Sequence, residues 1–341
     1  MNNNLTITDV AKLAGVSAAT VSRVINGQIG DRSKVKNRVL EVIEETGFQP
    51  NPVAQKLALQ RSSFIGLIFP NTVTSILSQQ YYIKTIESIT FACNHYNFNP
   101  VLFLSQSVSE EEKLFSKLSR PGMLDGLIAN VGCTNGERLI PLVKEVKIPV
   151  VLAGRCDELD SFSYVDIDNV RAAFNAVQHL LSLGRKRIAT ITGPLNVTDG
   201  RDRLEGYRRA LMARGFPVDE DLIVEGDYTE KTGYYSTKRI LSREIDGIFA
   251  ANDEMAIGAM HAVQEAGLSI PKDIAIIGFD DSAASSKTNP PLTTVRQPLG
   301  TFGSKLVELL VDQIENPDQI SRKIVLDTEL VIRQSCGETI W

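Results

Sequence analysis

The feature that most constrains this chain is the alternation, from Phe64 onward, of short apolar runs with longer amphipathic stretches. Continuous apolar runs are typical of strands buried on both faces of a parallel sheet, and the stretches between them suit helical crossovers. The strand candidates are 64–69, 101–104, 126–129, 149–153, 164–167, 187–192, 247–251, 274–278 and 293–296. The helix candidates are 79–96, 110–118, 136–145, 170–183, 201–214, 233–242, 254–266 and 301–314. About nine strands are many for one open sheet, so we expect an α/β body with two parallel-sheet lobes.

The residues before this body have a helical pattern instead. Thr8 is expected to cap a first helix, whose apolar positions include Val10, Leu13 and Ala14. Gly15 is expected to end it, because glycine adopts a left-handed conformation without a Cβ penalty. A tight turn between two short helices is predicted here.

Ser17 can cap the second short helix, which has Val21, Val24 and Ile25 on its buried side. The residues left to face outward are Ser17, Ala18, Thr20, Ser22 and Arg23. Small side chains at the start of a helix, with an arginine one turn on, suit close approach to the DNA major groove. An ordinary helical hairpin inside a larger core is the alternative.

Two further features continue this head. A third helix is predicted over 33–46, with Val35, Val39, Val42 and Ile43 on one face and Gly47 as its stop. The proline-bounded segment 49–58 is too short for a stable isolated helix, so we expect it to fold only when held against something.

The head contains the run T-x-x-D-V-A-x-x-A-G-V-S-x-x-T-V-S-R-V-x-N, followed by P-N-x-V-A-x-x-L. These two motifs resemble the lactose/galactose repressor (LacI/GalR) family of bacterial transcription regulators. The resemblance implies that 49–62 holds a hinge helix that orders on operator DNA and inserts Leu57 into the minor groove, as apolar wedges do. From spacing alone, Leu57 is equally well a core residue. The candidate DNA-binding residues are Thr6, Ser17, Ala18, Ala19, Thr20, Ser22, Arg23, Asn26, Asn51, Ala54, Lys56 and Leu57.

Ala18 and Ala19 depart from the family, which often has longer polar residues there. Alanine offers a base edge only apolar contact, for example with a thymine methyl group. Operator preference must then depend on Ser17, Thr20, Ser22, Arg23 and the hinge.

Charge separates the head from the body. Residues 1–62 hold eight Lys/Arg and five Asp/Glu, a net charge of +3, whereas the rest of the chain holds 28 and 36, a net charge of −8. Phosphate contacts from one such head are few, so two heads in a dimer would bind operator DNA far better.

The composition excludes several other classes of protein. With 341 residues and 43% hydrophobic content the chain is expected to be globular, and no apolar run approaches the roughly 20 residues of a membrane span. Met1 begins a polar segment without the pattern of an export signal, which predicts a cytoplasmic protein. Cys93, Cys133, Cys156 and Cys336 have no C-x-x-C spacing, so free thiols are expected.

Ligands of open α/β sheets bind beyond the carboxyl ends of the strands. The polar residues at those ends are Asp166, Asp168, Asn252, Asp253, Asp280 and Asp281. Carboxylates and amides pair with vicinal hydroxyls, so this inventory suits a sugar. Asp253 and Asp281 are expected mainly to cap the helices that follow, whereas Asn252 and Asp280 are the better ligand candidates.

The resemblance extends through the body, where Gly193-Pro194 and Arg201-Asp-Arg203-Leu-Glu-Gly-Tyr match a family block that implies an effector contact by Arg203. It also implies effector contacts for Asn252 and Asp280, and an aromatic contact for Tyr228, which is a core residue about as often. The segment after Phe69 departs from the family pattern, so the resemblance assigns no first-lobe contact there. The effector-binding candidates are Asp168, Arg203, Tyr228, Asn252, Asp280, Thr72, Ser75 and Gln79.

The family fold implied is a helix-turn-helix head plus a periplasmic-binding-protein-like body. We place the head at 1–48, the hinge and linker at 49–62, and the effector-binding and dimerisation domain at 63–341. Lobe 1 is expected at 63–163 and 293–322, and lobe 2 at 164–292 and 323–341.

The sequence therefore predicts a dimeric transcription regulator, most simply a repressor, that binds operator DNA and a sugar or sugar phosphate. No catalytic residue, metal or cofactor is expected, because there is no Walker-type loop, no G-x-S-x-G, and no histidine in metal-ligand spacing. The alternatives are a sugar-binding or sugar-processing protein, or a global regulator that depends on a co-repressor.

Overall fold

A computed structural model of the protein describes residues 5–25, 33–48, 62–69, 76–77, 79–104, 110, 113–115, 118, 122–131 and 139–337. The chain divides into two units, Met1–Ser63 and Phe64–Trp341. No helix among these described residues is long and apolar enough to cross a membrane.

The described residues of the head form three helices: α1 (Ile7–Ala14), α2 (Ala18–Ile25) and α3 (Lys34–Thr46). They close around a small core made up of Val10, Ala11, Ala14, Val21, Val24, Val39, Val42 and Phe48. Gly15 and Gly47 adopt positive φ values of 70° and 65° directly after α1 and α3, as expected of helix-ending glycines. The three-helix prediction is confirmed.

Some details of the head differ from the prediction. The cap of α1 is Thr6 and not Thr8: the Thr6 amide and hydroxyl both donate to Asp9, at 2.9 and 2.7 Å, and Thr8 lies inside the helix. Leu13 and Val35 were expected in the core but are exposed. Helices this short present a narrow buried stripe, and Val10 and Ala14 already fill it on α1.

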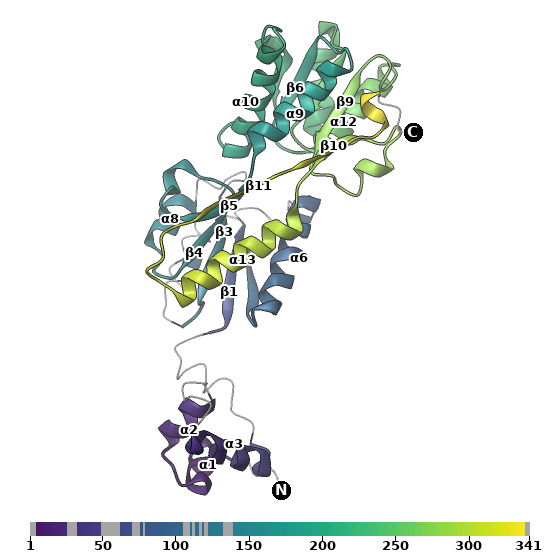
Figure 1. The fold of residues 1–341 in the computed structure, drawn as a ribbon. Helices are drawn as coiled ribbons and strands as arrows, with labels where there is room; N and C mark the ends of the chain where they lie inside the picture. Colours follow the sequence, from purple (N-terminus) through teal and green to yellow (C-terminus); the bar gives the residue numbers. More distant parts are fainter. Residues whose placement is uncertain are drawn as a thin grey trace. The chain divides into compact units, whose positions relative to one another are not determined.

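The body contains two six-stranded sheets, seen as two lobes in Figure 1. The first has the order β11-β5-β4-β3-β1-β2 and the second the order β12-β10-β9-β8-β6-β7. All neighbours are parallel except β10 and β12, which are antiparallel. The strands of the first sheet are β1 (Phe64–Phe69), β2 (Asn99–Leu104), β3 (Gly126–Asn130), β4 (Val150–Ala153), β5 (Ser163–Ile167) and β11 (Lys323–Leu326). Those of the second are β6 (Ile188–Thr192), β7 (Ile223–Glu225), β8 (Gly247–Ala250), β9 (Ala275–Phe279), β10 (Thr293–Arg296) and β12 (Glu329–Val331).

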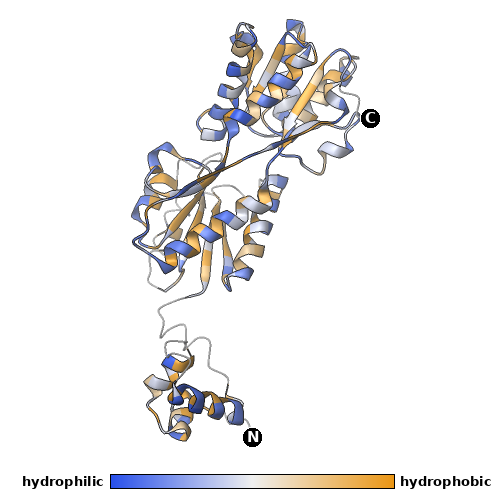
Figure 2. Ribbon diagram, viewed as in Figure 1, coloured by the Kyte–Doolittle hydropathy of each residue, from blue (hydrophilic) through white to orange (hydrophobic). Residues whose placement is uncertain are grey.

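Helices cover both sheets, and the apolar strands lie in the middle of each lobe (Figure 2). The first lobe has α6 (Gln80–His95), α8 (Ile140–Glu145) and α13 (Leu299–Glu315). The second has α9 (Asn169–Ser182), α10 (Thr198–Ala213), α11 (Glu230–Ile240) and α12 (Asp253–Glu265). Helices α6 and α13 lie side by side, and Phe302, Leu306 and Leu310 of α13 share a buried core with Ile65 and Leu67 of β1.

The chain passes between the lobes three times: between β5 and α9, between β10 and α13, and between β11 and β12. The predicted lobe boundaries were wrong at each passage, because they divided the chain before β5, β10 and β11 and not after them. Strand β5 pairs with β4 in the first sheet, β10 pairs with β9 in the second, and β11 pairs with β5 in the first. Each strand completes its own sheet first, and the chain crosses at the carboxyl end of that strand.

Candidate functional site

A pocket lies at the crossings of the body and has side chains from both lobes in its wall. The space between its walls, including the open mouth, is about 640 Å³. The lining residues are Gln79, Tyr81, Tyr82, Asn130, Ala153, Gly154, Arg155, Asp166, Ile167, Asn169, Thr198, Asp199, Arg203, Tyr228, Asn252, Asp280, Gln297 and Phe302. Most of these residues lie at or just beyond the carboxyl ends of strands, where open α/β sheets bind ligands.

Arg203 is the central cation of this pocket and is almost fully buried. Its guanidinium donates to Asn169 Oδ1 at 2.9 Å and to the Ala251 carbonyl at 2.5 Å, and it stacks on the Phe279 ring with 3.7 Å to the centroid. These contacts come from three different elements, α9, the end of β8 and β9. They hold the arginine in one orientation.

Tyr228 and Asp280 occupy left-handed backbone conformations, with φ values of 66° and 109°. Such conformations are costly for residues with a Cβ and are commonly found at functional sites. The Tyr228 hydroxyl is buried and lies beside the Asp199 carboxyl group. Burial, with the charge of Asp199 nearby, raises the pKa of Tyr228 well above its usual value, so the hydroxyl stays protonated and can donate.

The carboxyl groups of the pocket are also held away from water. Burial raises the pKa of Asp166 to about 7, although the Ile167 and Arg155 amides donate to it. Burial raises the pKa of Asp280 as well, and Gln297 donates to that carboxyl at 2.6 Å. Polar groups that are buried and only partly satisfied are suited to a ligand rich in hydroxyls.

Two ion-pair contacts join the lobes beside the pocket. Arg155, which follows β4 in the first lobe, donates to both carboxylate oxygens of Asp202 in α10 at 2.9 and 2.8 Å. Arg201 of α10 lies 3.9 Å from Asp157 of the first lobe. The lobes are therefore held together in the conformation described.

Five of the predicted effector residues line this one pocket: Gln79, Arg203, Tyr228, Asn252 and Asp280. Thr72 and Ser75 lie outside the described residues. Asp168 does not line the pocket, because its carboxylate caps α9 by accepting the Arg171 amide hydrogen at 2.9 Å. The effector contact predicted for Asp168 therefore has no support from this pocket.

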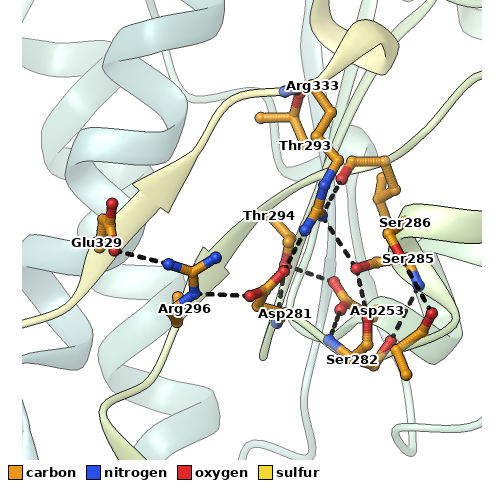
Figure 3. Close-up of polar contacts among 12 residues, drawn as sticks. Asp253, Asp281, Ser282, Ser285, Ser286, Thr293, Thr294, Arg296, Glu329 and Arg333 are labelled. Carbon is orange, nitrogen blue, oxygen red and sulfur yellow. Dashed lines mark hydrogen bonds and ion pairs between the residues drawn. The ribbon is translucent and has the colours of Figure 1, made fainter.

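Asn252 and Asp253 differ from their expected roles. The cap of α12 is Asn252, which accepts from the Met255 amide at 2.9 Å. Asp253 is fully buried and accepts from the Ser282 amide at 2.7 Å and the Thr294 hydroxyl at 2.6 Å. Figure 3 shows these contacts of Asp253, which caps no helix.

Asp281 is not a helix cap either. Its carboxylate joins Arg296, at 2.7 Å, to Arg333, and Arg296 also contacts Glu329 at 3.0 Å (Figure 3). This network links the end of β10 to the start of β12 and the segment after it. It stabilises the second lobe at two crossings.

Several pocket residues were not among the predicted effector contacts: Arg155, Asp166, Asn169, Asp199 and Gln297. Asp166 lies at a predicted strand end, but the prediction favoured Asp168. Arg155 and Gln297 lie one or two residues beyond β4 and β10, so the strand-end rule applied to every strand would have found them. Asp199 lies inside the first turn of α10, ahead of its arginines, and no such rule applies there.

The head presents a second candidate surface on α2. Ser17, Ala19 and Arg23 are exposed or partly exposed, and Ala18, Thr20 and Ser22 lie beside them on the same short helix. The Ser17 hydroxyl caps α2 by accepting from the Thr20 amide at 3.1 Å, and the two hydroxyls lie 2.8 Å apart. Thr6 is exposed at the start of α1, whereas Asn26, Asn51, Ala54, Lys56 and Leu57 lie outside the described residues.

Comparison with known proteins places both surfaces in context. Residues 6–51 match the family model of bacterial regulatory proteins of the lacI family, and residues 177–336 match a periplasmic binding protein-like domain. The HTH-type transcriptional regulator CelR of Thermobifida fusca is 34% identical over 334 residues, which cover 97% of this chain and 98% of CelR. Catabolite control protein A of Priestia megaterium is 35% identical over 335 residues, which cover 97% of this chain and 99% of the relative.

Solved structures agree with these sequence matches. A CelR–cellobiose complex has a TM-score of 0.76 at 33% identity and covers 97% of this chain and 99% of that one. The Lac repressor dimer bound to operator and the anti-inducer ONPF has a TM-score of 0.76 at 26% identity, covering 98% and 99%. The relatives are named as regulators, in agreement with the prediction of a regulator and not an enzyme. With its helix-turn-helix head, its two-lobed body and these matches over nearly the whole length, the chain belongs to the LacI family of bacterial regulatory proteins.

Proposed function

We propose that the protein is a cytoplasmic, homodimeric repressor that binds a two-fold operator through its heads and a small sugar in the pocket of its body. The observation that carries this proposal is the pocket itself, because both lobes contribute polar side chains to its wall. A ligand that contacts both lobes stabilises one relative arrangement of them. It can therefore alter how two copies present their heads.

The relatives support the two partners. The CelR structure contains cellobiose, and the Lac repressor structure is a dimer on its operator. Two heads reading two half-sites also compensate for the small positive charge of one head. On α2, Arg23 is the side chain with the longest reach to a base edge or phosphate.

A duplex selection tests the DNA-binding function. Purified full-length protein is incubated with random duplexes, the enriched site is recovered, and its affinity is measured by gel shift with and without saccharides. Arg23→Ala is expected to weaken binding to the enriched site at least tenfold, while the matched control Arg239→Ala, an exposed arginine of the body, leaves it unchanged. Recovery of no enriched site, or equal effects of the two variants, would contradict the proposal.

A further inference from the structure

The pocket is lined by more acidic than basic side chains. Its described lining includes three carboxylic acids, Asp166, Asp199 and Asp280, and two guanidinium groups, Arg155 and Arg203. Among those described lining residues there is no lysine or histidine. An anionic ligand would therefore have to be bound by the two arginines.

The guanidinium of Arg155 already has its counter-ions. One terminal nitrogen contacts both carboxylate oxygens of Asp202, at 2.9 and 2.8 Å, and the other contacts Asp157 at 2.6 Å. Two carboxylates thus face one arginine. Arg201 also lies 3.9 Å from Asp157, so the two arginines and these two carboxylates balance in charge and leave no unpaired positive charge on Arg155 for an anion.

The guanidinium of Arg203 is likewise engaged. It donates to Asn169 and to the Ala251 carbonyl, one face lies on Phe279, and Asp199 lies 3.9 Å from its third nitrogen. A phosphate or carboxylate that approached Arg203 would have to displace these protein acceptors. It would also have to approach Asp199 and Asp280, whose charges act on the same arginine.

Other carboxylates lie close to the acids of the pocket. Burial is the main cause of the raised pKa of Asp166, and the nearby charges of Asp199 and Asp202 raise it further. Burial likewise raises the pKa of Asp280, and the charges of Asp253 and Glu254 add to that rise. Where burial and nearby negative charge already disfavour ionisation of a carboxyl group, a further anion beside it is disfavoured as well. Hydroxyl groups, which donate without adding charge, are the complementary ligand groups.

Resting on the function proposed above, we propose that this pocket selects a neutral saccharide and rejects sugar phosphates and sugar acids. The hydroxyls of the ligand donate to Asp166, Asp199 and Asp280. The aromatic residues of the lining, among them Tyr81 and Phe302, offer apolar surface to the faces of the sugar ring.

Matched ligand pairs test this selectivity. Full-length protein is titrated by calorimetry with glucose and glucose 6-phosphate, cellobiose and cellobiose 6-phosphate, and glucose and glucuronate. We expect the neutral member of any pair that binds to be at least tenfold tighter than its charged partner. Equal or tighter binding of a phosphorylated or acidic member overturns the proposal.

The same ligands are added to the operator gel shift, which separates this inference from the proposed function. If a sugar phosphate binds and changes operator affinity, the protein is a sugar-responsive regulator and only the selectivity is wrong. If no saccharide, neutral or charged, binds or changes operator affinity, the proposed sugar response is wrong and the selectivity with it.

A variant locates the origin of the selectivity. Asp202→Asn removes a counter-ion from Arg155 and is expected to reduce the ratio of neutral to phosphorylated affinity at least threefold. Asp221→Asn is the matched control, because it breaks an exposed contact with Arg243, at 2.7 Å, outside the pocket lining. An unchanged affinity ratio in folded Asp202→Asn protein, or the same change in both variants, would show that the counter-ions of Arg155 do not cause the selectivity. The titrations of the wild-type protein test the selectivity itself even if a variant does not fold.

Discussion

At the scale of single residues, the packing of Tyr228 against Gly193 controls the shape of the pocket. A Cβ on Gly193 would lie 2.0 Å from the Tyr228 hydroxyl oxygen and 2.3 Å from the ring carbon that bears it. Real atoms do not approach so closely, so any larger residue at 193 must move the tyrosine. The tyrosine is itself held in a left-handed conformation and has little freedom to adjust.

We therefore expect Gly193→Ala to weaken effector binding at least tenfold and to destabilise the body by about 1–3 kcal/mol, the usual cost of overpacking. Calorimetric titration and thermal unfolding measure the two effects. Gly300→Ala is the control, because nothing lies within 4 Å of a Cβ at that position. Wild-type affinity in Gly193→Ala would show that Tyr228 does not shape the site.

Asp253 gives a pH dependence to stability. Burial raises its pKa to about 7, against the 3.8 of an ordinary aspartate, although Thr294 and Ser282 donate to it. Between these two values the folded state holds a proton that the unfolded state has lost, so the contribution of Asp253 to stability is greatest below about pH 4 and falls as the pH rises to about 7.

Asp253→Asn is expected to reduce this decline by up to about 1.4 kcal/mol per pH unit, which is the contribution of one proton. Urea unfolding of wild type and variant from pH 4 to pH 8 measures the difference. Parallel pH profiles would mean that Asp253 does not titrate in this range. Asp166, whose pKa is also raised to about 7, should leave part of the slope in the variant.

At the scale of secondary-structure elements, the crossings depend on the ion pairs around Asp281. Burial opposes the charged form of this carboxyl, but the contacts from Arg333 and Arg296 lower its pKa below the usual value. A lowered pKa stabilises the folded state above the ordinary aspartate pKa, and this stabilisation is lost as the solution is acidified.

Asp281→Asn should therefore destabilise the second lobe by about 1–3 kcal/mol at pH 7, because the partly buried Arg333 loses its counter-ion. Glu329→Gln, which removes an exposed partner of Arg296, should cost less than about 0.5 kcal/mol. Denaturant unfolding at pH 7 compares them. Equal losses would contradict a special role for Asp281.

The elements also show how far sequence alone can be taken. The nine predicted strands all exist, because their apolar runs are long enough to pair within a sheet. Strands β7, β11 and β12 were missed: as edge strands they consist mainly of half-buried and exposed residues, so they lack a continuous buried run. The rule that ligands bind at the carboxyl ends of strands located the pocket. It does not distinguish Asp166, which lines the pocket, from Asp168, which caps α9, because local backbone geometry decides which of the two carboxylates caps the helix.

At the scale of the whole molecule, the two proposed ligands must influence each other equally. If a saccharide changes operator affinity by some factor, operator DNA changes saccharide affinity by the same factor, commonly corresponding to about 1–3 kcal/mol of coupling free energy, or 5- to 150-fold. The sign of that coupling distinguishes an inducer from a co-repressor.

We expect the two factors to agree within error when operator binding is measured with saturating saccharide and saccharide binding with saturating operator. L-Glucose serves as the control for a response to D-glucose, since it has the same composition but places its hydroxyls differently. Unequal factors would indicate a further component, such as a change in oligomeric state.

The three passages between the lobes have a further consequence for synthesis of the protein. The first sheet takes its edge strand β11 and its covering helix α13 from residues that follow β10 of the second lobe in the chain. During translation, the strands that the ribosome releases first must wait for these late residues, with the apolar surface later covered by Phe302, Leu306 and Leu310 still open to water. The second lobe waits for its edge strand β12 and the residues after it, but most of its interior is covered by elements made before α13, whereas the lobe begun first keeps an apolar face open until α13 has been made.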